Sequence, residues 1–340
     1  MSKRILIRIP NWLGDAVMAT AAVNAYHEQH PEDIITLLGP PAMLTVFSSS
    51  YNPYNIIPFD KEDKDSGLRG LTRISSMLRD EYYDAGYLLT NSFSSALMMY
   101  LGKIPERIGY SGHFRSALLT EAVKPLQSHT HQIQQYSYLL NGADDQIPMP
   151  KILVSPEERE KARQVLEQEE CLGQNRIGIA IGAAYGPAKQ WPLERYRDLA
   201  KECVEKLDAI VLIFGGNAEI NAAEQIKQAV GKCVVNLAGK TTLRQLLPLI
   251  QLCQVVVSND SGVMHVSVAV KTPVVAIFGS TDPLKTGPLG DNHQVLYKNL
   301  PCSPCFERTC RFQHYDCLQK IETQDVFNKV EGLLTPAVVE

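Results

Sequence analysis

Short apolar segments rich in β-branched residues alternate along this chain with segments whose apolar residues recur at helical spacing. In the first half we expect strands at Arg4–Ile9, Asp33–Leu38, Asn55–Phe59 and Ala85–Leu89. Helices are expected at Ala16–Tyr26 and Leu68–Arg79, the second with apolar residues three or four positions apart. Regular alternation of strands with helices is typical of βαβ units, in which a parallel sheet lies between layers of helices.

A second series of the same kind follows a polar break near the middle of the chain. The segment GADDQIPMP at 142–150 has two prolines and no periodicity, so it is predicted to be a linker, with a polar helix after it at about Pro156–Glu169. The second series comprises Arg176–Ile181, Leu193–Leu207, Ala209–Phe214, Asn217–Val230, Cys233–Asn236, Thr242–Cys253, Val255–Ser258, Gly262–Val270 and Pro273–Phe278. A length of 340 residues suits two domains. Two such sheets facing each other would form a cleft.

Net charge and hydropathy argue against several classes of protein. The formal net charge is −4, which gives no whole-chain indication of nucleic-acid binding. Arg8 and Pro10 interrupt the first apolar run too early for a secretory signal peptide. No segment approaches the roughly 18 apolar residues of a membrane span. We therefore expect a cytoplasmic protein without a transmembrane segment, whose membrane contact is peripheral.

Two glycine-containing loops at predicted strand ends of the second half carry candidate ligand-binding residues, because ligands bind beyond the carboxyl ends of parallel strands. Lys189 lies in GAAYGPAKQWP at 182–192 and could hold a phosphate or be a solvated lysine. Glu219 lies in FGGNAE at 214–219 and could accept hydrogen bonds from ribose hydroxyls. Alternatively, Glu219 complements the dipole of the following helix.

A third loop, SNDSGVMH at 258–265, leads from an apolar strand into a helix. A run of small polar residues at this place offers N–H groups that suit a pyrophosphate, and His265 lies one turn further on. The alternative is simple helix capping by Asp260 or Ser261. The neighbouring FGSTDP at 278–283 adds hydrogen-bond donors. A G-x-G-x-x-G motif and a P-loop are both missing from the sequence, which argues against a standard dinucleotide site and a Walker ATPase.

The first half offers one candidate carboxylate and many scattered cations. Asp15 ends the motif PNWLGD at the start of a predicted helix, where it could be an N-cap, a general base, or both. The motif RIGYSGHFR at 107–115 carries several basic residues. Further cations are Arg69, Arg73, Arg79, Lys103 and Lys124. These cations would suit an anionic acceptor if they converge, and are otherwise solvated surface. The DKD at 63–65 lies in a charged loop, where we expect no metal.

Four cysteines near the C-terminus form a separate group. Cys302, Cys305, Cys310 and Cys317 have the spacing C-x2-C-x4-C-x6-C, with His314 between the last two. This pattern is compatible with a structural metal, with free thiols or with disulfides. A metal held there would be structural and away from the reaction.

Together these motifs resemble glycosyltransferase family 9, the lipopolysaccharide heptosyltransferases. The resemblance rests on PNWLGDAVM, RIGYSGHFR, GAAYGPAKQWP, FGGNAE, SNDSGVMH and FGSTDP, which occur in the family's order over roughly residues 3–325. It implies an α/β GT-B fold with two Rossmann-like domains facing across a cleft. Residues 1–150 would bind the acceptor and residues 151–320 the nucleotide-sugar donor, while a helix in 321–340 would pack back on the first domain.

The resemblance also implies an activity. It is the inverting transfer of L-glycero-D-manno-heptose from ADP-heptose to the first heptose of the lipopolysaccharide inner core, without an obligatory cofactor or metal. The acceptor would be lipid A–Kdo–heptose at the inner face of the inner membrane. Alternatives are another core step of the same family, a non-catalytic nucleotide-sugar-binding protein, or a sugar-nucleotide epimerase.

Roles for individual residues follow from the same resemblance. Asp15 looks like the catalytic base, Lys189 like the phosphate-binding lysine and Glu219 like a ribose-binding acid. The residues that match the donor-binding segment are Asp260, Ser261, Gly262 and His265.

Overall fold

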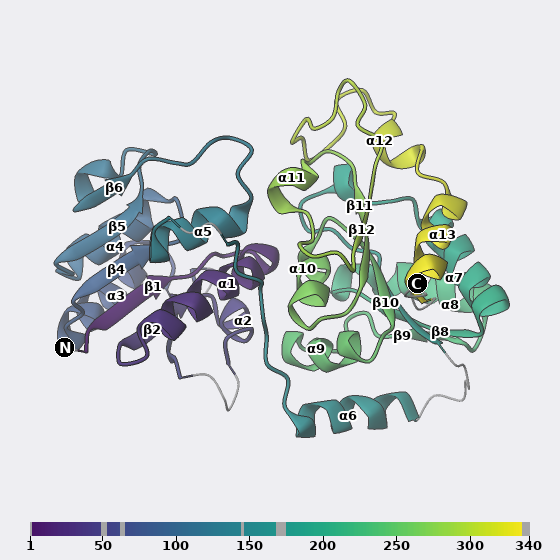
Figure 1. Cartoon of the computed structure of the whole chain (residues 1–340), viewed down its shortest axis with the longest axis horizontal. Coiled ribbons are helices and arrows are strands. Elements are labelled where there is room, and N and C mark those ends of the chain that lie inside the picture. Colours follow the sequence, from purple (N-terminus) through teal and green to yellow (C-terminus); the bar gives the residue numbers. More distant parts are fainter. Residues whose placement is uncertain (1, 49–52, 62–64, 144–145, 168–174, 335–340) are drawn as a thin grey trace. The chain divides into compact units, whose positions relative to one another are not determined.

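The computed structural model describes residues 2–48, 53–61, 65–143, 146–167 and 175–334. The chain divides into two compact units, Met1–Leu153 and Val154–Glu340. This division falls close to the predicted linker, and both units have the strand–helix alternation that the sequence indicates (Figure 1).

The N-terminal unit contains a six-stranded parallel sheet with the strand order β3-β2-β1-β4-β5-β6. Its strands are β1 (Arg4–Arg8), β2 (Ile34–Gly39), β3 (Asn55–Pro58), β4 (Ala85–Leu88), β5 (Glu106–Tyr110) and β6 (Glu121–Val123). This is the order of a Rossmann fold, in which successive strands first run to one side of β1 and then continue from β4 on the other side. The direction therefore reverses between β1 and β4, which are hydrogen-bonded neighbours.

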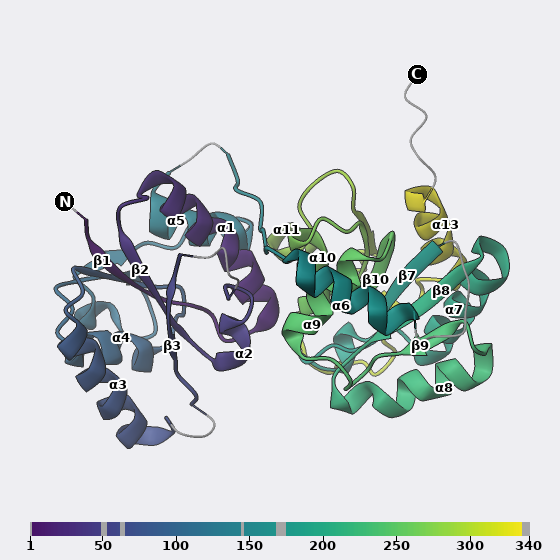
Figure 2. The ribbon, with the colours of Figure 1, turned by 90° about the horizontal axis from the view of Figure 1, so that it is seen from below.

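Helices cover both faces of this sheet (Figures 1 and 2). They are α1 (Leu13–Gln29), α2 (Pro41–Leu44), α3 (Gly67–Glu81), α4 (Phe93–Leu101) and α5 (Gln132–Asn141). α3 and α4 pack on one face, where Leu71, Ile74 and Leu78 of α3 enter the core as their helical spacing predicts. α1 lies on the other face with α5 beside it.

The C-terminal unit repeats this architecture with the order β12-β11-β10-β7-β8-β9. Its strands are β7 (Asn175–Ala180), β8 (Ala209–Phe214), β9 (Val234–Asn236), β10 (Val255–Asn259), β11 (Val274–Phe278) and β12 (Gln294–Tyr297). Counted within the unit, this is again the Rossmann order, and the reversal lies between β7 and β10.

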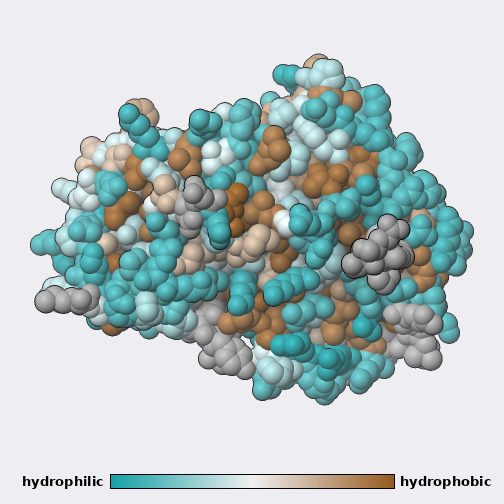
Figure 3. All heavy atoms as spheres, viewed as in Figure 1, coloured by the Kyte–Doolittle hydropathy of each residue, from teal (hydrophilic) through white to brown (hydrophobic). Residues whose placement is uncertain are grey.

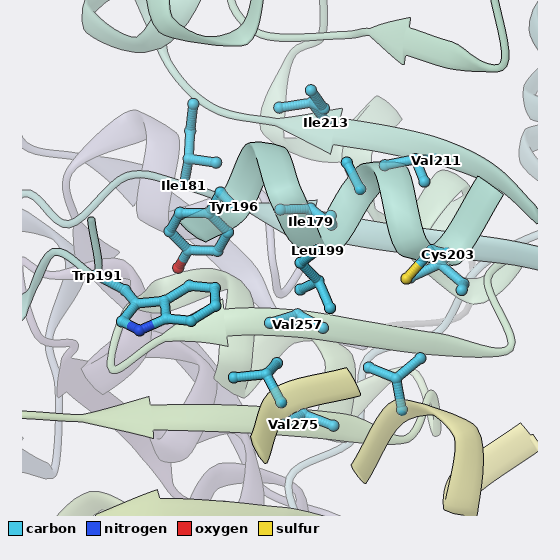
Figure 4. Close-up of a cluster of buried hydrophobic side chains, with 14 of the residues drawn as sticks. Ile179, Ile181, Trp191, Tyr196, Leu199, Cys203, Val211, Ile213, Val257 and Val275 are labelled. Carbon is cyan, nitrogen blue, oxygen red and sulfur yellow. The ribbon is translucent and has the colours of Figure 1, made fainter. Parts of the chain in front are cut away.

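The helices of the C-terminal unit also form two layers. They are α6 (Pro156–Glu167), α7 (Leu193–Leu207), α8 (Ile220–Val230), α9 (Leu243–Gln251), α10 (Gly262–Ala269), α11 (Pro283–Thr286), α12 (Asp316–Gln319) and α13 (Thr323–Leu334). α7, α8 and α13 share one core with the strands (Figure 4). In that core the ring of Trp191 meets Tyr196 edge-on at 4.9 Å, and its indole N–H donates to the carbonyl of Ile321 at 2.9 Å.

The last helix is part of the core of the C-terminal unit. We expected residues 321–340 to pack back on the N-terminal half. Val326, Phe327 and Val330 of α13 are buried in the core of the C-terminal unit, where the helix packs against α7, and packing of this segment on the N-terminal half stays a prediction. The apolar face of α13 is thereby occupied within its own unit; residues 335–340 lie outside the described part of the chain.

Hydrophilic residues predominate on the face of the molecule in Figure 3, with smaller apolar areas between them. Among the described residues, no helix combines the length and apolar character that crossing a bilayer requires.

Candidate active site

Most of the predicted site residues lie at the reversal points of the two sheets, whereas Glu219 follows β8. Asp15 comes from the loop and first helical turn after β1, and Lys189 comes from the equivalent loop after β7. Asp260 follows β10, the strand beside β7 at the reversal. Such points are the usual ligand-binding places of open α/β sheets, because the loops on either side separate there.

Asp15 is held from a neighbouring helix. It lies in the first turn of α1, but Trp12 occupies the N-cap position, so the carboxylate does not serve as the N-cap that we considered. The hydroxyl of Tyr136, from α5, donates to Oδ1 of Asp15 at 3.1 Å. Burial, and then the charge of Asp15, raises the pKa of Tyr136 far above its usual value. The tyrosine therefore stays protonated and donates to the carboxylate.

Arg8, the last residue of β1, is a buried cation that lies close to this loop. It is 1% exposed and forms no ion pair within the described residues. Its Nη2 donates to Oδ1 of Asn11 at 2.6 Å, and Nη1 donates to the carbonyl of Leu38 at 3.3 Å. Because an arginine can only donate, Asn11 must turn its amide oxygen inward and its NH2 group outward.

Arg115 repeats this arrangement after β5. It is 0% exposed, and its guanidinium donates to the carbonyl of Tyr110 and, at 2.8 Å, to Oδ1 of Asn91. Asn91 is exposed and lies between β4 and α4. Each arginine thus holds one asparagine so that its NH2 group faces away from the guanidinium. Asn11 lies beyond the carboxyl end of β1, and Asn91 lies beyond that of β4.

The scattered cations predicted from the sequence have more local roles. Arg73 pairs with the buried Asp65 of the DKD segment, of which residues 63 and 64 lie outside the described ranges. Arg107 donates to the carbonyls of Leu118 and Ile104. Sequence reasoning treated Arg8 only as an interruption of an apolar run. A charged residue inside an otherwise apolar strand was the signal that could have identified it.

In the C-terminal unit the predicted residues Lys189 and Asp260 meet directly. Nζ of Lys189 lies 2.5 Å from Oδ2 of Asp260, and the hydroxyl of Thr281 donates to the same oxygen at 2.5 Å. The side chains of the ion pair are 13% and 4% exposed. A buried ion pair adds little net stability because both charges lose water. This cluster joins the loops after β7, β10 and β11 and favours a ligand-binding role.

The start of α10 is the second part of this site. Ser261 occupies its N-cap position but makes no side-chain capping hydrogen bond, and Asp260 is engaged by Lys189 and Thr281. The capping alternative therefore does not account for either residue. Gly262 is the first residue of the helix, and His265 is buried one turn along it.

Two further residues connect these loops. The side chain of Asn259, which our sequence analysis did not single out, donates to the carbonyl of Ile181 and accepts from the backbone of Trp191, both at 3.0 Å. Glu219 accepts from the backbone N–H of Gly216 at 2.8 Å, and its carboxyl lies so close to Gly182 that a Cβ there would be 2.9 Å away. Glu219 also lines a cavity of about 510 Å³.

The four clustered cysteines line one small cavity together with His314. All four are free thiols, so the disulfide alternative is wrong for this structure. Among the described residues, no three or more His, Cys, Asp or Glu side chains are grouped so that they could hold a metal ion. Their segment is nevertheless attached to the site, since Phe306 N–H donates to the carbonyl of Ser280 at 2.7 Å.

This chain is similar to known proteins over most of its length. The model of glycosyltransferase family 9 (heptosyltransferase) matches residues 71–316. The chain is 30% identical to lipopolysaccharide heptosyltransferase 2 of Salmonella typhimurium, over 86% of this chain and 87% of that protein. It is 32% identical to lipooligosaccharide heptosyltransferase 2 of Haemophilus influenzae, over 86% and 88%.

Solved structures of similar proteins point to the same family. ADP-heptose LPS heptosyltransferase II of E. coli has a TM-score of 0.82 and 27% identity, covering 97% of this chain and 98% of that chain. A family 9 glycosyltransferase of Veillonella parvula has a TM-score of 0.89 and 22% identity, covering 98% of each. The two parallel six-stranded sheets are accordingly the Rossmann-like domains of a GT-B fold, and the chain belongs to glycosyltransferase family 9.

Proposed function

We propose that this protein is an inverting glycosyltransferase that moves L-glycero-D-manno-heptose from ADP-heptose to the first heptose of the lipopolysaccharide inner core. One observation carries the proposal: each Rossmann-like unit places a different kind of chemistry at its own reversal point. The N-terminal unit has a carboxylate there, and the C-terminal unit has a lysine, a threonine and a helix start. The heptosyltransferase 2 relatives support the choice of donor and acceptor.

Asp15 is proposed as the general base. It takes the proton of the acceptor hydroxyl while that oxygen attacks the anomeric carbon from the face opposite ADP. The new bond joins acceptor oxygen to sugar carbon, and the bond to the β-phosphate oxygen breaks, with its electron pair leaving on ADP. Positive charge develops on the sugar ring on the way, as in glycoside hydrolysis. The hydrogen bond from Tyr136 positions the carboxylate for this step.

Lys189 and the first amides of α10, at Ser261 and Gly262, are proposed to stabilise the departing diphosphate. Cations and helix N-termini stabilise charge that develops on a phosphate, and one such group typically contributes about 2.7–4 kcal/mol. Asp260 and His265 would position these groups, and Glu219 would bind the ribose. Because fixed protein groups supply this charge stabilisation, we expect the reaction to proceed without an obligatory metal. We further propose that it takes place on the cytoplasmic face of the inner membrane.

Purified full-length protein with ADP-heptose and two defined acceptors tests the proposal. One acceptor ends in Kdo and the other carries a single heptose; both are assayed with EDTA and with Mg²⁺. We expect one heptose to be added to the second acceptor only, equally well with EDTA. Transfer only to the Kdo-terminated acceptor would show a different core step. Bound but unreacted ADP-heptose would indicate a binding protein, and its isomerisation without acceptor would indicate an epimerase.

A further inference from the structure

The cysteine-rich segment, Cys302–Cys317, has no role in the proposed reaction. It is nevertheless hydrogen-bonded to two loops of the proposed donor site. The hydroxyl of Ser303 donates to the carbonyl of Gly279 at 2.5 Å, and Phe306 N–H donates to Ser280 in the same loop. On the other side the backbone carbonyl of Arg308 accepts from Ala188 N–H at 3.1 Å. The segment therefore bridges the loops that carry Lys189 and Thr281.

The position of Arg308 is closely defined by this attachment. Gly186 has a φ of +143°, and a Cβ there would lie 2.6 Å from the carbonyl oxygen of Arg308. The hydroxyl of Tyr185 donates to the carbonyl of Phe306, two residues before Arg308. A glycine is thus required for the close approach of the two backbones, and the base of the Arg308 side chain is fixed beside the Lys189 loop.

Arg308 and Lys189 direct their charges to the same aromatic ring. The guanidinium carbon of Arg308 lies 5.3 Å from the centroid of Tyr185, and Nζ of Lys189 lies 4.8 Å from it. Arg308 is exposed and forms no ion pair within the described part of the chain. Both charges are thus at cation–π distance from one ring.

The balance of charges at Lys189 and Arg308 indicates which kind of anion they would bind. The charge of Lys189 is already offset by Asp260 at 2.5 Å, so the pair offers little net positive charge to a ligand. A nucleoside diphosphate that leaves a sugar carries several negative charges, of which the α10 start compensates about half of one. Arg308 adds a full charge, and its planar fork can bind phosphate oxygens through two parallel hydrogen bonds.

We propose that Arg308 is a second phosphate-binding cation, which holds the diphosphate of the donor together with Lys189. The cysteine-rich segment then has a function: it carries this arginine to the donor site. The inference rests on the proposed use of a nucleoside-diphosphate donor by the C-terminal unit.

The test measures binding of ADP and of adenosine to the full-length protein by calorimetry, for wild type, Arg308→Ala, Arg308→Lys and Arg311→Ala. Arg311 is the matched control, because it belongs to the same segment, is exposed, and stacks on Phe312 at 4.8 Å instead of on Tyr185. We expect Arg308→Ala to weaken ADP binding at least about 10-fold and adenosine binding less than twofold. Arg308→Lys should fall between wild type and Arg308→Ala, and Arg311→Ala should match wild type.

Two outcomes would overturn the inference. Unchanged ADP affinity in Arg308→Ala shows that the guanidinium does not contact the diphosphate. Equal loss of ADP and adenosine affinity shows that the arginine acts only by shaping the loop. If wild type itself binds no ADP, the proposed donor fails first, and that result is distinct from both.

Discussion

Arg8 and Arg115 are buried charges, and burying a charge costs folding free energy. Their hydrogen bonds to neighbouring groups have to offset this cost. Burial lowers the pKa of Arg8 to about 10 from 12.5, which corresponds to roughly 3 kcal/mol of unfavourable burial. Because 10 is still far above neutral pH, the guanidinium remains charged. Each arginine fixes an asparagine amide, Asn11 or Asn91, whose NH2 group faces away from it. We infer that these amides contribute to acceptor binding.

Replacing Arg8 should weaken acceptor binding without changing the stability of the protein. In Arg8→Met the burial cost of the charge is relieved, which offsets the lost hydrogen bond to the carbonyl of Leu38, so we expect little change in Tm. Asn11 loses its partner, and the acceptor KM should rise about 10-fold while ADP affinity is unchanged. Arg4→Met is the control, because Arg4 lies at the other end of β1 in an exposed pair with Glu81. An unchanged acceptor KM in Arg8→Met contradicts the role of Arg8.

Asp15→Asn tests the base directly. The amide keeps the shape of the side chain and can still accept from Tyr136, but it cannot take a proton. We expect turnover to fall at least about 100-fold and ADP affinity to stay within a few fold. Asp33→Asn is a matched control, since Asp33 also accepts from a tyrosine, Tyr26, at 3.1 Å. Retained turnover in Asp15→Asn would remove Asp15 from its role.

The thiols should differ in reactivity, because their surroundings shift their pKa values in different directions. Burial opposes ionisation of Cys310, but backbone N–H groups of residues 312–315 outweigh it and lower its pKa. Burial and neighbouring thiols raise the pKa of Cys317 to about 11, and burial raises that of Cys253 to about 12. Since the thiolate is the nucleophile, iodoacetamide should label Cys310 before Cys317 and Cys253 at pH 7, as read by mass spectrometry. Equal labelling rates in the folded protein would contradict this order, and urea should abolish it.

At the scale of elements, the site depends on loops packed too closely for ordinary side chains. The loops after β7 and β11 touch at Gly279, where a Cβ would lie 2.8 Å from the backbone oxygen of Ala188 and 2.8 Å from Leu318. The same two loops carry Lys189 and Thr281, so their separation sets the distance between the groups around Asp260. Close packing of these loops therefore positions the groups that are proposed to bind the donor.

Gly279→Ala should damage this packing. The added methyl group meets backbone, which cannot move away cheaply, so we expect a loss of about 1–3 kcal/mol of stability in urea unfolding and weaker ADP binding. Gly332→Ala provides the contrast, because a Cβ in that part of α13 meets nothing within 4 Å. It should be neutral or stabilising by up to about 1 kcal/mol. A Gly279→Ala protein as stable as wild type, with normal ADP affinity, would show that the loops can separate freely.

At the scale of the whole molecule, each unit has its own sheet, its own core and its own set of polar groups. The residues proposed to bind the donor, from Lys189 to Arg308, all belong to the C-terminal unit, whose core also includes α13. The carboxylate and the two asparagine amides belong to the N-terminal unit. In the proposed reaction, donor binding belongs to the C-terminal unit and activation of the acceptor to the N-terminal unit.

A chain of residues 154–340 should therefore fold and bind ADP with an affinity close to that of the full protein, but transfer no sugar. Calorimetry and the transfer assay check the two parts. Phe327→Ala in this fragment should cost about 3–5 kcal/mol, because the ring is buried in the core. A soluble, folded fragment that does not bind ADP would contradict the assignment of the donor site to this unit.

The sequence by itself determined the α/β class, the two series of βαβ units and the loops in which Asp15, Lys189 and Asp260 lie. Those features depend on short-range patterns: alternation of strands and helices, and polar residues directly after apolar runs. The apolar face of the last helix predicts burial without specifying the partner, and the structure shows that this face packs in the core of the C-terminal unit.

Only the tertiary structure decided which groups meet. Tyr136 reaches Asp15 across 121 residues, and Lys189 reaches Asp260 across 71. These contacts depend on strand order, which brings distant loops to one edge of a sheet and which no local pattern specifies. For the same reason the sequence could not show that Arg8 binds Asn11, and it could not place Arg308 beside Tyr185. Solvation, burial and charge pairing are properties of the packed chain.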